Sequence, residues 1–292
     1  MTGQRNSFKA FFALIAGLSF MSFSAILIKS SHAPGIVTAF YRMGIAAVLL
    51  FIPFVYYLTT HKKALPAKGV LLAVMAGMCF GFDMSFWSTG IVASNATIPT
   101  IFANTAPLWV GVGSFFIFRE KHKRGFWVGL LIAFSGIPML LKNDFYASSN
   151  ILFGALLGLT AGLFYGTYLL ISQPGRELLN TLSFLFISSL SSAIVLGVFT
   201  LLFDYDFTGY DRHTVLIFIL YGLGVQVIGW FLVNYSQGYI PASIVSPTLL
   251  GQPLGTAFLA VILLHEHLTL WHITGGIVII TGIYIIHFSR KR

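Results

Sequence analysis

Residues 86–136, FWSTGIVASNATIPTIFANTAPLWVGVGSFFIFREKHKRGFWVGLLIAFSG, recur in register as residues 234–282, NYSQGYIPASIVSPTLLGQPLGTAFLAVILLHEHLTLWHITGGIVIITG. The matched pairs are Ser88/Ser236, Gly90/Gly238, Pro99/Pro247, Pro107/Pro253, Glu120/Glu266, Gly129/Gly275 and Gly136/Gly282. The chain is therefore two copies of one unit, placed at 1–146 and 147–292 within one membrane domain. Each copy holds five apolar stretches. Because five is odd, the second copy is inverted in a membrane, as in many secondary transporters.

The composition predicts an all-α membrane protein. Hydrophobic residues fill 57% of the 292 positions and charged residues only 9%, whereas soluble domains carry about 25% charged residues. Apolar runs of about 20 residues match the hydrocarbon core of a bilayer. Ten such runs are predicted, at 8–30, 35–58, 69–92, 96–118, 125–142, 150–172, 181–203, 214–237, 241–264 and 269–289. The connections are too short for a soluble catalytic or nucleotide-binding module.

The formal charge of +9 follows membrane topology and does not indicate a nucleic-acid partner. With a cytoplasmic N-terminus, thirteen basic residues lie inside: Arg5, Lys9, Lys62, Lys63, Lys68, Arg119, Lys121, Lys123, Arg124, Arg176, Arg290, Lys291 and Arg292. Only Lys29, Lys142 and Arg212 lie outside. This positive-inside bias places both termini in the cytoplasm of a multi-pass protein. We expect the membrane to be a bacterial inner membrane.

Other features argue against a cleaved signal peptide, a disulfide framework and a metal site at residues 265–267. The basic and then apolar N-terminus imitates a signal peptide but has no A-x-A-like cleavage site. Cys79 is the single cysteine, so no disulfide framework can form. The run His265-Glu266-His267 offers one acidic group, and Lys121 stands at the position equivalent to His267. We therefore expect no metal site and no cofactor.

Prolines interrupt equivalent spans of the two halves. Pro99 and Pro107 fall in the fourth span, and Pro241, Pro247 and Pro253 fall in the ninth. Paired interruptions are typical of the binding site of a transporter, so Pro107 and Pro253 are predicted hinges. Polar residues lie beside them, with Asn104 and Gln252 as candidate solute contacts. The alternative is that these polar groups only satisfy the backbone groups that a proline frees.

Two ionisable residues lie clearly within spans, where a charge is costly and commonly functional. They are Arg42 in the second span and Asp83 in the third, at similar predicted depths. The two can be partners in a structural ion pair. Trp87 lies one helical turn from Asp83, and a carboxylate near aromatic rings suits an ammonium group. Asp83 is therefore also a candidate contact for a solute, or the group that couples transport to protons.

The eighth span carries a polar stripe at helical spacing, formed by Gln226, Trp230, Asn234 and Gln237. Such a stripe faces a cavity or a neighbouring helix and not lipid. Tyr165 in the sixth span is a further candidate. We predict a solute site between the third, fourth, eighth and ninth spans, formed by Arg42, Asp83, Trp87, Asn104, Tyr165, Gln226, Trp230, Asn234 and Gln252.

Small and acidic residues predict how the helices are held. Gly154, Gly158, Gly162 and Gly166 form a smooth stripe on the sixth span for a neighbouring helix. A carboxylate at the end of one helix can bond the backbone amides that open the next helix, so Glu120 and Glu266 are interpreted as structural fasteners.

These residues resemble a known family. Pro253, Leu264-His265-Glu266-His267-Leu268, Gly275 and Gly282 are similar to the signature of the EamA-type branch of the drug/metabolite transporter superfamily. The first half repeats the pattern from Pro107 to Gly136, and Phe40-Tyr41-Arg42 is similar to the second span of the family. The resemblance implies ten helices in a five-plus-five inverted arrangement around a central cavity. Members move amino acids, other metabolites, nucleotide sugars or drugs, mostly outward in bacteria. Asp83 matches no general motif of the family.

We therefore expect a secondary carrier that exports an amino acid or related metabolite by alternating access. A carrier for an organic cation, drug or nucleobase is the alternative within transport. An intramembrane enzyme would need clustered catalytic groups at membrane depth. A channel would need a continuous pore, which paired broken helices disfavour.

Overall fold

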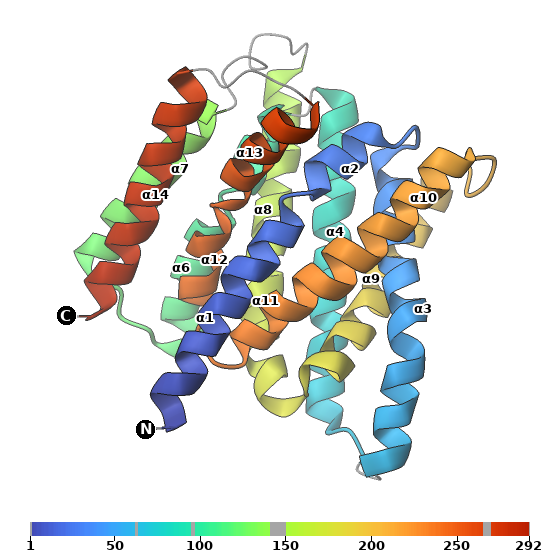
Figure 1. Ribbon diagram of the computed structural model, residues 1–292, viewed down its shortest axis with the longest axis horizontal. Helices are drawn as coiled ribbons and strands as arrows, with labels where there is room; N and C mark the ends of the chain where they lie inside the picture. The colour runs from blue at the N-terminus through green and yellow to red at the C-terminus, as the bar shows by residue number, and fades with distance from the viewer. Residues whose placement is uncertain (1, 62–63, 95–96, 141–149, 265–269, 292) are drawn as a thin grey trace.

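The computed structural model describes residues 2–61, 64–94, 97–140, 150–264 and 270–291, and within them every regular element is a helix (Figure 1). Nine helical stretches of this described part are long and apolar enough to cross a membrane. The shorter apolar helix Arg124–Met139 makes a tenth. The predicted all-α fold with five spans in each half is confirmed, and the predicted boundary at 146/147 lies outside the described residues.

The first half begins with a span that is broken into two helices. Its elements are α1 (Thr2–Met21), α2 (Ser24–Ser30), α3 (Gly35–His61), α4 (Ala67–Ala93), α5 (Thr97–Ala103), α6 (Ala106–Phe118) and α7 (Arg124–Leu140). Helices α5 and α6 are the two parts of the fourth span. The break in the first span has no proline, and the sequence did not predict it.

Two spans of the second half are not single α-helices. Its elements are α8 (Ile151–Leu178), α9 (Thr181–Leu202), α10 (Arg212–Leu220), the π-helix η2 (Tyr221–Gly229), α11 (Trp230–Gln237), α12 (Ala242–Leu249), α13 (Gln252–Leu264) and α14 (Leu270–Lys291). The eighth span runs through α10, η2 and α11, and the ninth consists of α12 and α13.

The helices alternate in direction, so the connections form two faces. Both termini lie toward the same end of the bundle (Figure 1), which we call the terminal face. The connections 119–123, 179–180 and 238–241 share this end. The opposite end, called the far face, carries the connections 31–34 and 203–211.

Repeat glycines join the two halves along α7 and α14, which pack side by side. A β-carbon at Gly129 would lie 2.7 Å from the carbonyl oxygen of Gly282, and one at Gly136 would lie 2.7 Å from that of Gly275. In the repeat, Gly129 corresponds to Gly275 and Gly136 to Gly282. The contacts are crossed, because Gly129 meets Gly282 and Gly136 meets Gly275. Two antiparallel helices related by a two-fold axis in the membrane plane have this pattern.

The predicted glycine stripe of α8 receives the fourth span. A β-carbon at Gly158 would lie 2.5 Å from the carbonyl oxygen of Pro99, and one at Gly162 would lie 2.7 Å from Thr105 Oγ1. Thr105 stands in the gap between α5 and α6. Membrane helices gain their association energy from such close backbone approach, so the stripe positions the break in the fourth span.

The breaks in the fourth and ninth spans lie where their prolines predict them. Pro107 is in the first turn of α6, and Pro253 is the second residue of α13. A proline is tolerated there because the first N–H groups of a helix have no partner inside it. The prolines therefore begin the second part of each span.

Candidate functional site

Arg42 of α3 binds the eighth span near the middle of the bundle. Its Nε donates a hydrogen bond to Gln226 Oε1 at 2.8 Å, and its Nη1 donates to the Tyr221 hydroxyl at 2.9 Å. The guanidinium also lies over the rings of Tyr221, at 4.8 Å, and Phe80, at 5.5 Å. Arg42 is 3% exposed, so these contacts hold a cation that water does not solvate.

The π-helix explains why both Tyr221 and Gln226 reach Arg42. The two residues are five positions apart in the sequence, and on an α-helix this spacing places their side chains about 140° apart. A π-helix has a longer turn, with hydrogen bonds from i to i+5. The segment η2 contains both residues and therefore brings them to one face. A search at α-helical spacing finds Gln226 but misses Tyr221.

Asp83 of α4 is buried but not bonded. It is 3% exposed, and among the described residues its carboxylate makes no hydrogen bond and no ion pair within 4.0 Å. The contact ion pair with Arg42 that the sequence allowed is therefore not formed, because Gln226 and Tyr221 hold the guanidinium. Arg42 acts on Asp83 only through space.

Aromatic rings from three helices gather on the same side of α4 as Asp83. Phe80 lies 4.7 Å from the ring of Tyr168 and 4.8 Å from that of Trp230, measured between centroids. Tyr165 lies 6.2 Å from Phe80 and 6.1 Å from Trp230. Residues three apart on a helix share a face, so Phe80 and Asp83 face this group together. The sequence did not predict Phe80 or Tyr168.

Two polar groups of the eighth span complete this region. Asn234 Nδ2 donates to the Tyr168 hydroxyl at 3.1 Å and to the Trp230 carbonyl at 2.9 Å, so Asn234 is bound within the bundle. The Trp230 Nε1–H is buried and has no partner within the described structure. We use the name central cluster for this set of residues: Arg42, Phe80, Asp83, Tyr165, Tyr168, Tyr221, Gln226, Trp230 and Asn234.

Three predicted site residues instead bind near the breaks. Trp87 Nε1 donates to Thr100 Oγ1 at 3.0 Å, and Asn104 Nδ2 donates to the Thr100 carbonyl at 2.8 Å. Gln252 Nε2 donates to the Met21 carbonyl at 3.2 Å, which is at the break in the first span. Asn104 and Gln252 thus bond backbone carbonyls near the breaks, and the Thr100 carbonyl also accepts the backbone N–H of Asn104.

The breaks in the first and ninth spans are bonded to each other. Ser22 Oγ donates to the Gln252 carbonyl at 3.3 Å, and Thr256 Oγ1 donates to the Ser22 carbonyl at 2.8 Å. A β-carbon at Gly255 would lie 2.1 Å from Ser22 Oγ. The unpredicted break in the first span is therefore hydrogen-bonded to the break in the ninth span, through a residue 230 positions away.

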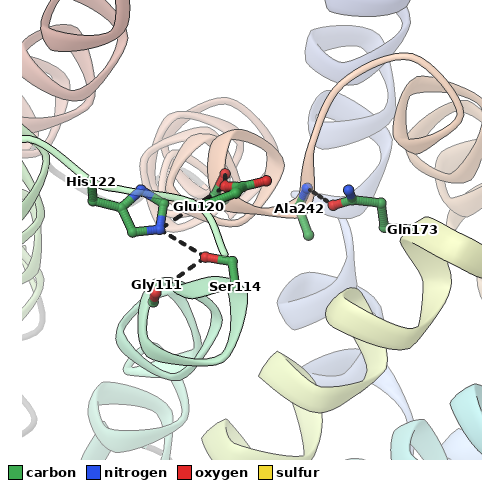
Figure 2. Close-up of polar contacts among 7 residues, drawn as sticks. Gly111, Ser114, Glu120, His122, Gln173 and Ala242 are labelled. Atoms are coloured by element: carbon green, nitrogen blue, oxygen red, sulfur yellow. Dashed lines mark hydrogen bonds and ion pairs between the residues drawn. The ribbon is translucent and has the colours of Figure 1, made fainter. Parts of the chain in front are cut away.

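A second polar cluster ties the fourth, sixth and ninth spans at the terminal face (Figure 2). Ser243 Oγ at the start of α12 donates to Glu120 Oε2 at 2.5 Å. The backbone N–H of Ala242 donates to Gln173 Oε1 of α8 at 2.8 Å. Glu120 therefore fastens the start of the ninth span through a side-chain hydroxyl, whereas the sequence predicted a bond to the backbone amides of the next helix. Its equivalent Glu266 lies outside the described residues.

The turn that directs Glu120 is a left-handed helix end. Arg119 has φ 56°, and the Glu120 N–H donates to the Ser114 carbonyl at 3.2 Å. Glycine is the usual residue at such a left-handed helix end. His122 lies 4.0 Å from Glu120 Oε2 and 2.7 Å from Ser114 Oγ, measured from Nε2. We call Ser114, Glu120, His122, Gln173, Ala242 and Ser243 the terminal-face cluster.

Burial lowers the pKa of His122 below its ordinary value of 6.5, and nearby Glu120 partly offsets this effect. Its imidazole also stacks on Phe126 at 4.2 Å between centroids. The neutral ring therefore fits this arrangement better than the charged one.

An all-helical bundle of two inverted halves, with broken spans and a buried charge, defines the class of multi-pass membrane transporters. The chain belongs to the EamA-like transporter family, whose model matches residues 7–142 and 152–288. It is a transporter of a small solute and not an enzyme.

Similar proteins agree with this class. The uncharacterized transporter YetK of Bacillus subtilis (strain 168) is 24% identical over 300 residues, covering 97% of this chain and 88% of its own. An S-adenosylmethionine uptake transporter of Rickettsia prowazekii (strain Madrid E) is 24% identical over 257 residues, covering 87% and 83%. A solved protein structure superposes with a TM-score of 0.79 at 15% identity over 99% of both chains, which shows the fold.

Proposed function

We propose that this protein is a secondary carrier for an amino-acid-type zwitterion and works by alternating access. The observation that carries the proposal is the presence of two buried ionisable groups, one acidic and one basic, that do not bond each other. Asp83 has no hydrogen bond among the described residues. Arg42 uses Nε and Nη1, and no bond of its Nη2 group to a described residue is formed.

The unused bonding capacity of these two groups matches one kind of solute. An unpaired charge inside a protein costs several kcal/mol, so each group favours a partner of opposite charge. An ammonium group fits Asp83 and the neighbouring aromatic rings. A carboxylate fits the free edge of the Arg42 guanidinium. The Trp230 N–H, which has no partner among the described residues, adds a donor for a further polar group of the solute.

The named relatives support a metabolite of this type. S-adenosylmethionine, which the Rickettsia relatives are named for, combines an amino-acid group with a sulfonium cation. An organic cation without a carboxylate would leave Arg42 without its partner. The Rickettsia relatives are named for uptake, whereas the sequence predicted export.

A panel of related ligands tests the proposal. Thermal shifts of purified protein would compare amino acids with their decarboxylated amines and deaminated acids, since a ligand stabilises the state that it binds. We expect stabilisation by zwitterions only, and counterflow of the same compounds in proteoliposomes. Equal stabilisation by the amines would indicate that the solute is an organic cation and not a zwitterion. Flux without saturation or counterflow would contradict a carrier.

The terminal-face cluster supports a gate at that end. Helix α12 is buried along its whole length and packs against α6. Residues 252–257, which form the first turns of α13, are half-buried. Within the described residues, no comparable packing joins α5 to α13. We therefore assign this structure to a state that is closed at the terminal face, where α6 of the fourth span packs against α12 of the ninth span.

We propose a bacterial cell membrane with the terminal face in the cytoplasm. A fluorescent protein fused after Arg292 should fluoresce, and alkaline phosphatase fused in the 203–211 connection should be active, because the enzyme needs an oxidising compartment. The control is a phosphatase fusion at 179–180, which should be inactive. An active phosphatase at the C-terminus would contradict this orientation.

We propose that Pro107 and Pro253 set the hinges. Alanine at either position would restore a backbone donor and let α-helix extend into the break. We expect transport rates to fall severalfold at unchanged abundance, measured by uptake and immunoblot. The matched control is Pro53→Ala, since Pro53 lies exposed inside α3, away from the breaks. Wild-type rates in both hinge variants would show that the prolines are only tolerated.

A further inference from the structure

Two imidazoles and a carboxylate meet on the far face, away from both clusters described above. His32 follows α2, while Asp211 and His213 stand at the start of α10. The ligand atoms of the three side chains lie within 4.8 Å of one another. His32 Nδ1 lies 3.8 Å from Asp211 Oδ2, and the two imidazole centroids are 5.7 Å apart. All three side chains are exposed.

Hydrogen bonds hold two of these residues in place. Asp211 Oδ1 accepts the N–H of Thr214 at 3.0 Å as the cap of α10, so Oδ2 is directed toward His32. The His32 backbone N–H donates to Thr214 Oγ1 at 3.3 Å. An aspartate at the protein surface is ionised at neutral pH, as a metal ligand has to be.

We propose that His32, Asp211 and His213 form a site for a divalent transition-metal ion of the zinc type. Two imidazoles and one carboxylate are a ligand set that zinc uses, with water at the remaining position. Bonds of about 2.0–2.1 Å require the ligand atoms to approach to about 3–3.5 Å. Because all three side chains are exposed, small rotations can bring their ligand atoms to this spacing.

A bound ion would join segments that are far apart in the sequence. His32 belongs to the connection between the first and second spans, and the other two ligands begin the eighth span. Helix α2 packs against both α10 and α13 (Figure 1). The ion would therefore stabilise the arrangement of the first and eighth spans at the far face, whatever solute the central cluster binds.

Binding of Zn²⁺ to purified protein without a histidine tag tests the proposal. Titration against a chromophoric chelator should show one ion per chain and a higher unfolding temperature. We expect His32→Ala, His213→Ala and Asp211→Asn each to weaken binding at least about tenfold, as loss of a ligand does. Asn still caps a helix, so Asp211→Asn separates ligation from folding.

The matched control is His61→Ala, because His61 is an exposed histidine at the terminal face. It should leave the affinity unchanged. Equal affinity in the wild type and the triple variant would overturn the proposal, as would a lack of binding by the wild type. Because these measurements need no transport, they stand apart from the test of the solute class.

Discussion

Asp83→Asn should leave the protein folded and remove most of its solute binding. The carboxylate makes no hydrogen bond or ion pair with a described residue, so the amide breaks no contact of the fold. We expect the stability to change by less than about 1 kcal/mol. A charge-assisted hydrogen bond contributes about 1.5–3 kcal/mol, which corresponds to roughly 10- to 100-fold in solute affinity. Ligand titration and denaturant unfolding measure the two effects separately.

A double variant decides between a site role and a purely structural role for Asp83. If the carboxylate only neutralises Arg42, Asp83→Asn should lower stability by roughly 3–5 kcal/mol, and adding Arg42→Gln should restore fold and transport. If Asp83 binds the solute or carries a proton, the double variant stays inactive. Full transport by the double variant, which lacks both charges, would contradict the proposed site. Glu177→Gln is the matched control, since Glu177 is an exposed carboxylate of α8.

The effect of pH on transport tests whether Asp83 also couples to protons. In that case wild-type uptake should respond to an imposed pH gradient, and Asp83→Asn should still exchange solute but no longer respond. The physical reason is that an amide cannot bind and release a proton in this pH range. An unchanged response in the variant would assign the coupling to another group.

Glu120→Ala should open the terminal face. The Ser243–Glu120 hydrogen bond, at 2.5 Å, has a carboxylate oxygen as its acceptor. A bond of this kind contributes about 1.5–3 kcal/mol. Its loss would shift the equilibrium between the two gate states by roughly 10- to 100-fold. The reporter is Ser246→Cys in a Cys79→Ser background, because Ser246 is buried in α12. Labelling by an impermeant thiol reagent should accelerate.

Variants of the partner residue test whether the effect belongs to this bond. Ser243→Ala should accelerate labelling as Glu120→Ala does, and the double variant should be no faster than either, since all three remove one contact. Ser236→Ala is the matched control, because the one hydrogen bond of Ser236 Oγ to a described residue goes to the Val233 carbonyl of its own helix. Additive effects of Glu120 and Ser243 would contradict a shared bond.

The same gate should respond to acid through His122. Burial lowers the pKa of this imidazole in the closed arrangement, whereas exposure on opening would return it toward 6.5. Closure is therefore fully favoured above pH 6.5 and weakens as the pH falls toward the lowered value. Glu120 is the titratable group in contact with the ring. Labelling of Ser246→Cys should accelerate below pH 6.5, and His122→Gln should remove this dependence.

The sequence by itself determined the repeat, the ten spans and the breaks in the fourth and ninth. These features follow from constraints that act locally in a bilayer: apolar length, missing proline donors and small residues at helix contacts. The four repeat glycines of α7 and α14 also mark contacts that the structure contains. Arg42, Asp83, Tyr165, Gln226, Trp230 and Asn234 were predicted as site residues, and the structure gathers them in the central cluster.

Only the tertiary structure decided which groups are free and which are bound. Arg42 binds Tyr221 because a π-helix changes the face on which that side chain lies. The first span breaks without a proline because the ninth span supplies its hydrogen bonds. His32 meets Asp211 through the packing of helices from opposite halves. Such contacts join residues about 180 or more positions apart, and no periodicity along one helix contains that information.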